Sequence, residues 1–308
     1  MIALMIIAGL VLLVFGGDAL VKGASALARR MGVSELMIGL TLVGFGTSTP
    51  ELVTSINAAM IGSPGIAVGN VVGSNIANIL LILGAAALIY PIAIQREAMK
   101  RDGVFLMLSA LMCLALVYAG FMDRIWGAAF VLFLLGYTYY VYTKEKQTHP
   151  DLASAHEEPH SSLVKDIAYA IGGIAVTIAG AKLLVSGSVD LARIAGIDET
   201  IIGLTIVAVG TSLPEMVTSV MAALKKKSDI AIGNIVGSNI YNIWFIMGAT
   251  ALVHPIPVPE TIIGFDIWVM LAATAALLVL TFAQGKISRI GGGLFLAGYA
   301  AYIWALIP

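Results

Sequence analysis

The sequence predicts an all-α integral membrane protein in which ten transmembrane helices form two inverted five-helix repeats. Apolar residues occupy 59% of the 308 positions and charged residues 11%, whereas a soluble domain carries about a quarter charged residues. The segment GTSTPELVTS at 46–55 returns as GTSLPEMVTS at 210–219, and GNVVGSNIANI at 69–79 returns as GNIVGSNIYNI at 233–243. The composition thus indicates an integral membrane protein, and the duplication indicates that its two halves are related.

Ten apolar segments approach the roughly 20 residues that are needed to cross the hydrocarbon layer. The predicted helices cover residues 2–28, 34–60, 65–90, 102–120, 124–143, 164–191, 199–224, 229–253, 262–283 and 288–306. Gly, Pro, Ser, Thr and Asn interrupt the second, third, seventh and eighth, so these four are expected to be broken helices. The first segment has no basic start and no small-residue cleavage site, which favours a retained span over a signal peptide.

Lys and Arg are distributed unevenly over the predicted loops. Thirteen Lys and Arg residues lie in loops that follow an odd-numbered helix, and only Arg124 and Arg193 lie in loops that follow an even-numbered helix. Because loops rich in Lys and Arg stay on the cytoplasmic side, both termini of this multi-pass protein are expected outside the cell membrane. The net charge of −1 gives no basic field, so no nucleic-acid partner is expected, and no obligatory protein partner is inferred.

The two copies align without a gap, and 26 of the 42 positions between 38 and 79 are identical to those 164 positions later. Five predicted helices separate each residue from its counterpart, so the second copy enters the membrane in the opposite direction. The chain therefore divides into a first repeat at 1–143, a cytosolic linker at 144–163 and an inverted second repeat at 164–308. Inverted repeats are typical of secondary transporters, and no enzymatic activity is expected because the residues of an intramembrane hydrolase are missing.

Each copy holds one carboxylate in an otherwise apolar stretch, at Glu51 and Glu215. An ionisable residue inside a membrane is costly to bury, so a repeated one points to an ion pathway. Pro50 and Pro214 precede the glutamates and cannot donate a backbone hydrogen bond. A break in each helix is therefore expected directly beside its carboxylate.

Oxygen atoms dominate the polar groups near these glutamates. The hydroxyl groups at the breaks and the polar stripes on the following helices are Thr47, Ser48, Thr211, Ser212, Asn70, Ser74, Asn78, Asn234, Ser238 and Asn242. The prolines are expected to free backbone carbonyl oxygens in the preceding turns, around Gly44 and Ala208. Asn75 and Asn239 point about 100° away from the neighbouring serines, so they are expected to bind freed backbone rather than ions.

An all-oxygen set suits hard cations, above all Ca²⁺, and Na⁺ accepts the same atoms. One Ca²⁺, two Na⁺ or two protons would each neutralise the two glutamates, so either load could cross without uncompensated buried charge. The empty, doubly negative site would switch reluctantly, which favours strict exchange. Single Ser, Thr or Gly residues in spans are usually packing contacts, and only the duplication of a glutamate in proline-broken, hydroxyl-rich segments favours an ion site.

The paired GTSxPE and GNxxGSN motifs resemble the α-repeats of the cation/calcium exchanger superfamily, specifically its Na⁺/Ca²⁺ exchanger branch in compact prokaryotic form. The resemblance covers nearly the whole chain. It implies an electrogenic antiporter that exchanges Na⁺ for Ca²⁺ by alternating access, with no cofactor, in which the first and sixth helices slide across the other eight. The ion ligands that it implies are Glu51, Glu215, Thr47, Ser48, Thr211, Ser212, Ser74, Ser238, Asn78, Asn242 and the carbonyls of Gly44 and Ala208.

Two departures from the superfamily's pattern narrow this expectation. Potassium-dependent exchangers have aspartate where Asn242 stands, so K⁺ co-transport is not expected. Eukaryotic exchangers carry a large regulatory insert where this chain has the linker at 144–163, so Ca²⁺ regulation of that kind is not expected. A H⁺/Ca²⁺ antiporter is the alternative, because protons can replace Na⁺ on both glutamates, and a cation channel is a third reading.

Overall fold

A computed structural model of the chain describes residues 1–62, 64–148, 162–195, 208–258, 262 and 264–306, most of them helical. In the first half the helices are α1 (Ile2–Met31), α2 (Glu35–Ile38), the π-helical turn η1 (Gly39–Val43), α3 (Gly44–Thr47), α4 (Thr49–Met60), α5 (Pro64–Ala77), the π-helical turn η2 (Asn78–Leu83), α6 (Gly84–Ile89), α7 (Arg96–Ala119) and α8 (Arg124–Thr148). In the second half they are α10 (Leu163–Ile194), α12 (Ala208–Thr211), α13 (Leu213–Leu224), α14 (Ser228–Tyr241), the π-helical turn η4 (Asn242–Met247), α15 (Gly248–Val253), α17 (Asp266–Gln284) and α18 (Arg289–Leu306).

Seven of the described helices are long and apolar enough to cross a membrane, or eight if the bent pair Glu35–Thr47 and Thr49–Met60 counts as one span. The predicted seventh helix begins within 196–207, outside the described residues. The predicted fourth helix, expected from 102, begins earlier, at Arg96. The prediction of a helical membrane protein is thus confirmed, and the count of ten helices stays a prediction.

The four predicted breaks are of two kinds. The helix axis bends by 43° where α3 meets α4, and Ser212 separates α12 from α13 with φ −89° and ψ 7°. The third and eighth predicted helices instead run without a break over Gly65–Ile89 and Ser228–Val253. The prediction of broken helices is wrong for these two, because a π-helical turn absorbs an irregularity without interrupting the helix.

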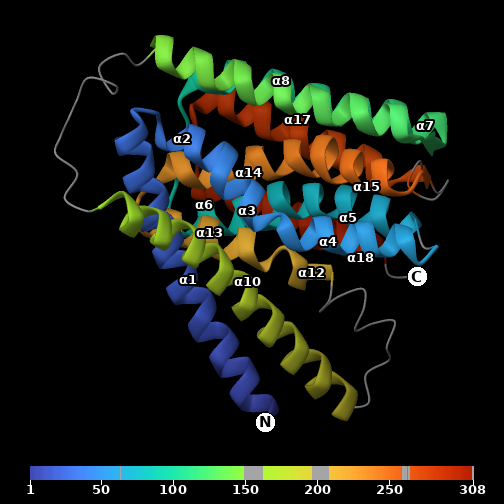
Figure 1. Ribbon diagram of the computed structural model, residues 1–308, viewed down its shortest axis with the longest axis horizontal. Helices are drawn as coiled ribbons and strands as arrows, with labels where there is room; N and C mark the ends of the chain where they lie inside the picture. Colours follow the sequence, from blue (N-terminus) through green and yellow to red (C-terminus); the bar gives the residue numbers. More distant parts are fainter. Residues whose placement is uncertain (63, 149–161, 196–207, 259–261, 263, 307–308) are drawn as a thin grey trace.

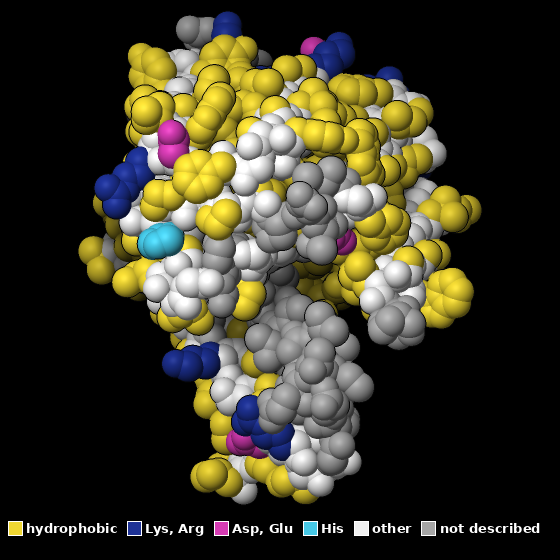
Figure 2. Space-filling view, turned by 90° about the vertical axis from the view of Figure 1, so that its right-hand side faces the viewer, with side chains coloured by type: hydrophobic (Ala, Val, Ile, Leu, Met, Phe, Trp, Pro, Cys, Tyr) yellow, Lys and Arg dark blue, Asp and Glu magenta, His cyan; other side chains and the backbone are white. Residues whose placement is uncertain are grey.

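The outer surface is largely apolar. Hydrophobic side chains cover most of the broad upper body of the molecule (Figure 2). Exposed examples on different helices are Leu132, Val279, Leu294 and Trp304. Apolar surface on this scale marks contact with lipid rather than with water, in agreement with the helices' composition.

α1 and α10 form an antiparallel pair that leans away from the rest of the bundle and extends below it in Figure 1. Glycines at seven-residue spacing line the contact on both helices, at Gly9, Gly16, Gly23, Gly173, Gly180 and Gly187. A Cβ atom at Gly9 would lie 2.9 Å from the carbonyl oxygen of Gly180, and one at Gly16 would lie 2.6 Å from the amide nitrogen of Thr177. Because the two backbones touch, each of these helices packs more closely against the other than against any other described helix.

Two small antiparallel sheets join the halves of the chain. β1 (Ile92–Ala93) pairs with β4 (Lys286–Ile287), and β2 (Phe121–Met122) pairs with β3 (Ile256–Pro257). Each sheet takes one strand from each half. β3 is the counterpart of β1 in the repeat, and β4 is the counterpart of β2, so the two sheets are equivalent when the halves are interchanged. The predicted all-α fold did not include these strands, since two residues are too few to show an alternating pattern.

Two close helix contacts at glycines are also equivalent when the halves are interchanged. A Cβ atom at Gly84 of α6 would lie 3.0 Å from the carbonyl oxygen of Gly292 in α18. One at Gly248 of α15 would lie 3.0 Å from the carbonyl oxygen of Gly127 in α8. Each half therefore packs its third predicted helix against the last helix of the other half.

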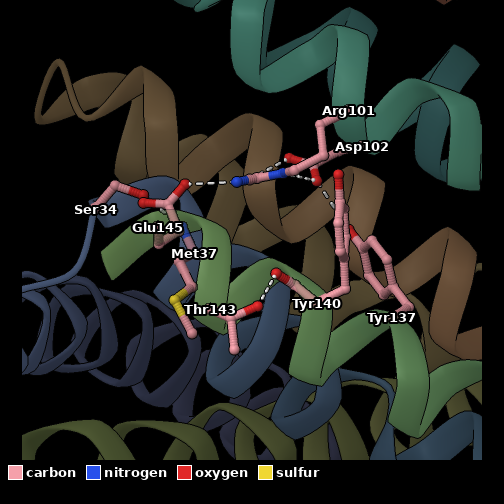
Figure 3. A network of polar contacts seen from close by, with 8 residues as sticks. All are labelled: Ser34, Met37, Arg101, Asp102, Tyr137, Tyr140, Thr143 and Glu145. Atoms are coloured by element: carbon pink, nitrogen blue, oxygen red, sulfur yellow. Dashed lines mark hydrogen bonds and ion pairs between the residues drawn. The ribbon is translucent and has the colours of Figure 1, made fainter. Parts of the chain in front are cut away.

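A buried ion-pair network ties α7 to α8, and it uses none of the duplicated motifs (Figure 3). Arg101 donates to both carboxylate oxygens of Asp102, at 2.7 and 2.9 Å, and to Oε1 of Glu145 at 2.9 Å. The hydroxyl of Tyr137 donates to Asp102 at 3.3 Å. Both carboxylates are buried, so a single guanidinium compensates two charges inside the protein.

Candidate ion-binding site

Glu51 and Glu215 occupy equivalent places, each in the first turn of the helix that follows a break. Each glutamate is only 1% exposed. Pro50 and Pro214 lie at the start of the same helices, where the missing N–H costs nothing because the first amides of a helix have no intrahelical acceptor. The helix breaks therefore bring two carboxylates into the protein interior.

Each glutamate is held by a serine from the other half. Ser48 donates to Oε1 of Glu215 at 2.8 Å, and Ser212 donates to Oε1 of Glu51 at 3.1 Å. Ser212 also lies 3.5 Å from the hydroxyl of Ser74. These reciprocal bonds bring together the two glutamate segments that the sequence repeats.

Asn78 and Asn242 begin the π-helical turns η2 and η4. Their amide groups donate across the halves, Asn78 to Oδ1 of Asn239 at 2.9 Å and Asn242 to Oδ1 of Asn75 at 3.1 Å. The expectation that Asn75 and Asn239 bind freed backbone is therefore wrong. Packing places an asparagine of the opposite half, not an open carbonyl, opposite each of them.

Four buried oxygen atoms in this cluster have no hydrogen-bond donor within the described ranges. They are Oε2 of Glu51, Oε2 of Glu215, Oδ1 of Asn78 and Oδ1 of Asn242. α4 packs on η4 and α13 packs on η2, so each glutamate's helix lies beside the π-helical turn that carries an asparagine. A buried acceptor without a donor costs about 1–3 kcal/mol, and a bound cation satisfies such an oxygen.

A second layer of asparagines supports the glutamate helices. Asn70 donates to the backbone carbonyl of Glu51 at 3.2 Å and to the hydroxyl of Ser55 at 2.9 Å. In the other half Asn234 makes the same two bonds, to Glu215 and Ser219. Both asparagines thus fix the first turn that carries the carboxylate.

The remaining predicted ligands lie at the same breaks. Thr47 is buried, and its hydroxyl lies 3.1 Å from the carbonyl oxygen of Val43 and 3.2 Å from Oδ1 of Asn234. The hydroxyl of Ser238 lies 3.5 Å from the carbonyl oxygen of Gly44. Thr211 is half-buried at the end of α12. Ala208 begins that helix, and its surroundings lie outside the described residues.

The predicted release of the Gly44 carbonyl is wrong. Its oxygen accepts the backbone amide of Ser48 at 3.1 Å. Pro50 lacks the amide that would bond the carbonyl of Gly46, four residues earlier. The carbonyl of Gly44 is instead bonded by the amide of Ser48, which the proline does not affect. The hydroxyls of Thr47 and Ser238 also lie within 3.5 Å of the same oxygen.

The donor set is made of oxygen. No group of three or more His, Cys, Asp or Glu side chains with metal-binding geometry occurs among the described residues. Two carboxylates, amide oxygens and hydroxyls suit hard cations that accept flexible oxygen coordination, and they suit soft transition metals poorly. The cluster is therefore a candidate site for an alkali or alkaline-earth cation.

Bent helices that meet at a buried oxygen cluster are typical of secondary transporters, and this is the class that the fold and the cluster define. The family model described as "Sodium/calcium exchanger protein" matches residues 1–143 and 165–307. The chain therefore belongs to the sodium/calcium exchanger family, a family of transporters rather than enzymes.

Similar proteins agree with this family. The "Putative antiporter CaxA" of Alkalimonas amylolytica is 39% identical over 313 residues, covering 98% of this chain and 97% of that protein. The "Sodium/calcium exchanger MaX1" of Methanosarcina acetivorans is 35% identical over 341 residues, with the same coverage of 98% and 97%. A solved structure of the sodium-calcium exchanger NCX_Mj, soaked with Na⁺ and Ca²⁺, matches with a TM-score of 0.87 and 32% identity, covering 100% of this chain and 99% of that one.

Proposed function

We propose that this protein is a secondary antiporter that exchanges Na⁺ for Ca²⁺ across the cell membrane by alternating access. The observation that carries the proposal is the set of four buried oxygens that have no donor among the described residues, on Glu51, Glu215, Asn78 and Asn242. Two of them belong to carboxylates, which match the charge of one Ca²⁺ or two Na⁺. The names of relatives, "Sodium/calcium exchanger" among them, support Na⁺ and Ca²⁺ as the two transported ions.

The proposed ligands extend beyond these four oxygens to the hydroxyl and carbonyl groups of the breaks. They are Glu51, Glu215, Asn78, Asn242, Thr47, Ser48, Thr211, Ser212, Ser74, Ser238 and the carbonyls of Gly44 and Ala208. Two Na⁺ and one Ca²⁺ both neutralise the glutamates, so either load can cross with its charge compensated. Any additional Na⁺ adds net charge, which makes transport electrogenic and sensitive to membrane potential.

We propose further that ten transmembrane helices form two inverted repeats, at 1–143 and 164–308, joined by a cytosolic linker at 144–163. The matched pairs of sheets, glycine contacts and serine–glutamate bonds support this arrangement, since each has a counterpart with the halves exchanged. In the alternating-access step, the rigid pair of α1 and α10 slides as a unit over the bundle. The close packing between α1 and α10, which exceeds the packing of either helix against any other described helix, supports that motion.

The cell membrane is the proposed location, with both termini outside. The "Inner membrane protein YrbG" of Escherichia coli is 35% identical over 302 residues, covering 96% of this chain and 93% of that protein, and its name supports the location. The predicted excess of Lys and Arg on the linker side supports the orientation.

Flux in reconstituted vesicles tests the exchange reaction. Proteoliposomes loaded with Na⁺ are diluted into Na⁺-free medium that contains ⁴⁵Ca²⁺, and Ca²⁺ uptake is expected only with the outward Na⁺ gradient. Uptake driven by a proton gradient but not by Na⁺ would replace the proposal with a H⁺/Ca²⁺ antiporter. Uptake without any counter-ion would indicate a channel.

Independence from K⁺ has its own test. Asn242 is an uncharged amide, so the centre holds two carboxylates and has no third charge to neutralise with K⁺. Ca²⁺ uptake by the unaltered protein is expected to be the same whether K⁺ or choline accompanies Na⁺. The Asn242→Asp variant adds a negative charge and is expected to change the Na⁺ dependence of uptake. A requirement for K⁺ in the unaltered protein would contradict this part of the proposal.

A further inference from the structure

Asn75 and Asn239 are buried side chains that stand outside the proposed ligand set. They are 2% and 1% exposed. Each lies three residues before an asparagine of the ligand set in its own helix, yet each contacts the asparagine of the other half. Asn75 accepts from Asn242 at 3.1 Å, and Asn239 accepts from Asn78 at 2.9 Å.

These contacts decide which end of each ligand amide faces the ion. A side-chain amide has an oxygen that accepts and a nitrogen that donates. Because the nitrogens of Asn78 and Asn242 are engaged by Asn239 and Asn75, their oxygens remain as the free ends, and both are buried without a donor in the described structure. A flipped amide would present its N–H groups, which repel a cation.

The two orienting asparagines are not equivalent. Nδ2 of Asn75 is held 3.7 Å from the sulfur of Met270 on α17. Nδ2 of Asn239 is buried and has no acceptor among the described residues. Replacing Asn239 therefore removes only its acceptor bond from Asn78, whereas replacing Asn75 also removes the contact with Met270.

We propose that Asn75 and Asn239 are positioning residues that hold the amides of Asn242 and Asn78 with their oxygens toward the transported cation, and so raise cation affinity without touching the ion. The inference rests on the proposed function, since it concerns the same site. Because both bonds cross between the halves, each half would orient an ion ligand of the other half.

Calcium binding to the purified full-length protein, measured by calorimetry, tests the inference without relying on transport. Asn239→Leu is expected to raise the Kd for Ca²⁺ about tenfold, and Asn78→Ala is expected to raise it by a similar factor. The Kd of the double variant Asn239→Leu/Asn78→Ala is expected to equal that of Asn78→Ala alone, because Asn239 acts only through Asn78. Asn239→Asp keeps the acceptor and is expected to bind Ca²⁺ no more weakly than the unaltered protein.

The outcomes separate the inference from the proposed function. If the unaltered protein binds no Ca²⁺, the proposed function fails. If it binds Ca²⁺ and Asn239→Leu binds equally well, or if the two single effects multiply in the double variant, only the inference is overturned. A purely structural role would lower the thermal midpoint of the ion-free protein and leave the Kd unchanged. Should Asn239→Leu not fold, Asn75→Leu with Asn242→Ala provides the corresponding double-mutant cycle in the other half, with Met270→Leu as the control for the contact that Asn75 makes with Met270.

Discussion

Ser48 donates a hydrogen bond to Glu215 across the two halves of the chain, at 2.8 Å. The counterpart bond from Ser212 to Glu51, at 3.1 Å, closes the pair. Each carboxylate therefore has one oxygen held by the opposite half and one oxygen without a donor among the described residues. The orientation of both free oxygens depends on contacts that neither half can make by itself.

Removing the hydroxyl of Ser48 tests the value of that contact. Ser48→Ala is expected to raise the Ca²⁺ concentration for half-maximal uptake about tenfold or more, since a hydrogen bond to a charged group contributes about 1.5 kcal/mol or more. Thr49→Ala is the matched control, because its hydroxyl is at the surface and bonds only the backbone of Phe45, at 3.4 Å. Equal effects of the two variants on uptake kinetics would show that Ser48 does not orient Glu215.

Neutralising either glutamate is expected to abolish exchange. Glu51→Gln and Glu215→Gln each leave one carboxylate, so a bound Ca²⁺ would carry an uncompensated charge through the protein. ⁴⁵Ca²⁺ uptake is expected to fall to the level of empty liposomes, while size-exclusion profiles and helical circular dichroism remain unchanged. A variant that transports at a rate near that of the unaltered protein would remove its glutamate from the site.

A bulky residue between α1 and α10 is expected to separate the pair. A Cβ atom at Gly173 would lie 2.7 Å from Cα of Leu20 and 2.9 Å from the carbonyl oxygen of Gly16. Gly173→Leu should therefore stop exchange and lower the thermal midpoint of the protein. Gly172→Leu is the control, since a Cβ there meets nothing within 4 Å. Equal flux and stability of the two variants would contradict close packing of this helix pair.

The network around Arg101 is expected to contribute to stability and not to ion selectivity. Arg101→Met leaves Asp102 and Glu145 buried without their shared cation, which costs about 3–5 kcal/mol when one partner of a buried pair is lost. Lys100→Met is the control, because its ion pair with Glu97 is exposed and worth little. Thermal unfolding in detergent is the measurement, and a midpoint for Arg101→Met equal to that of the control would refute the assignment.

Hydropathy and the duplicated motifs predict much of this structure. Apolar segments of membrane length place most helices within a few residues, and Pro50 with Pro214 locates the breaks beside the glutamates. The repeat indicates one ion site shared by the two glutamates, whereas the bond from Ser48 to Glu215 is seen only in the structure. These features depend on local composition and on symmetry, which a sequence displays directly.

Other features depend on packing that a single sequence does not display. Asn75 points away from Ser74, as helical geometry requires, but only the tertiary arrangement places Asn242 in that direction. Arg101 reads as one of several basic residues near a helix end, and its two acidic partners are not recognisable as such from spacing. The π-helical turns at Asn78 and Asn242 preserve the helix where polar residues alone suggest a break.

The strands that link the halves have a consequence for how the protein is made. β2 belongs to the first half of the chain, and its partner β3 follows more than one hundred residues later. The helices of the first half are therefore inserted by the ribosome and translocon well before the surfaces they pack against exist. Gly127 and Gly84 pack against Gly248 and Gly292 of the second half, so these contacts can form only after synthesis has reached that half.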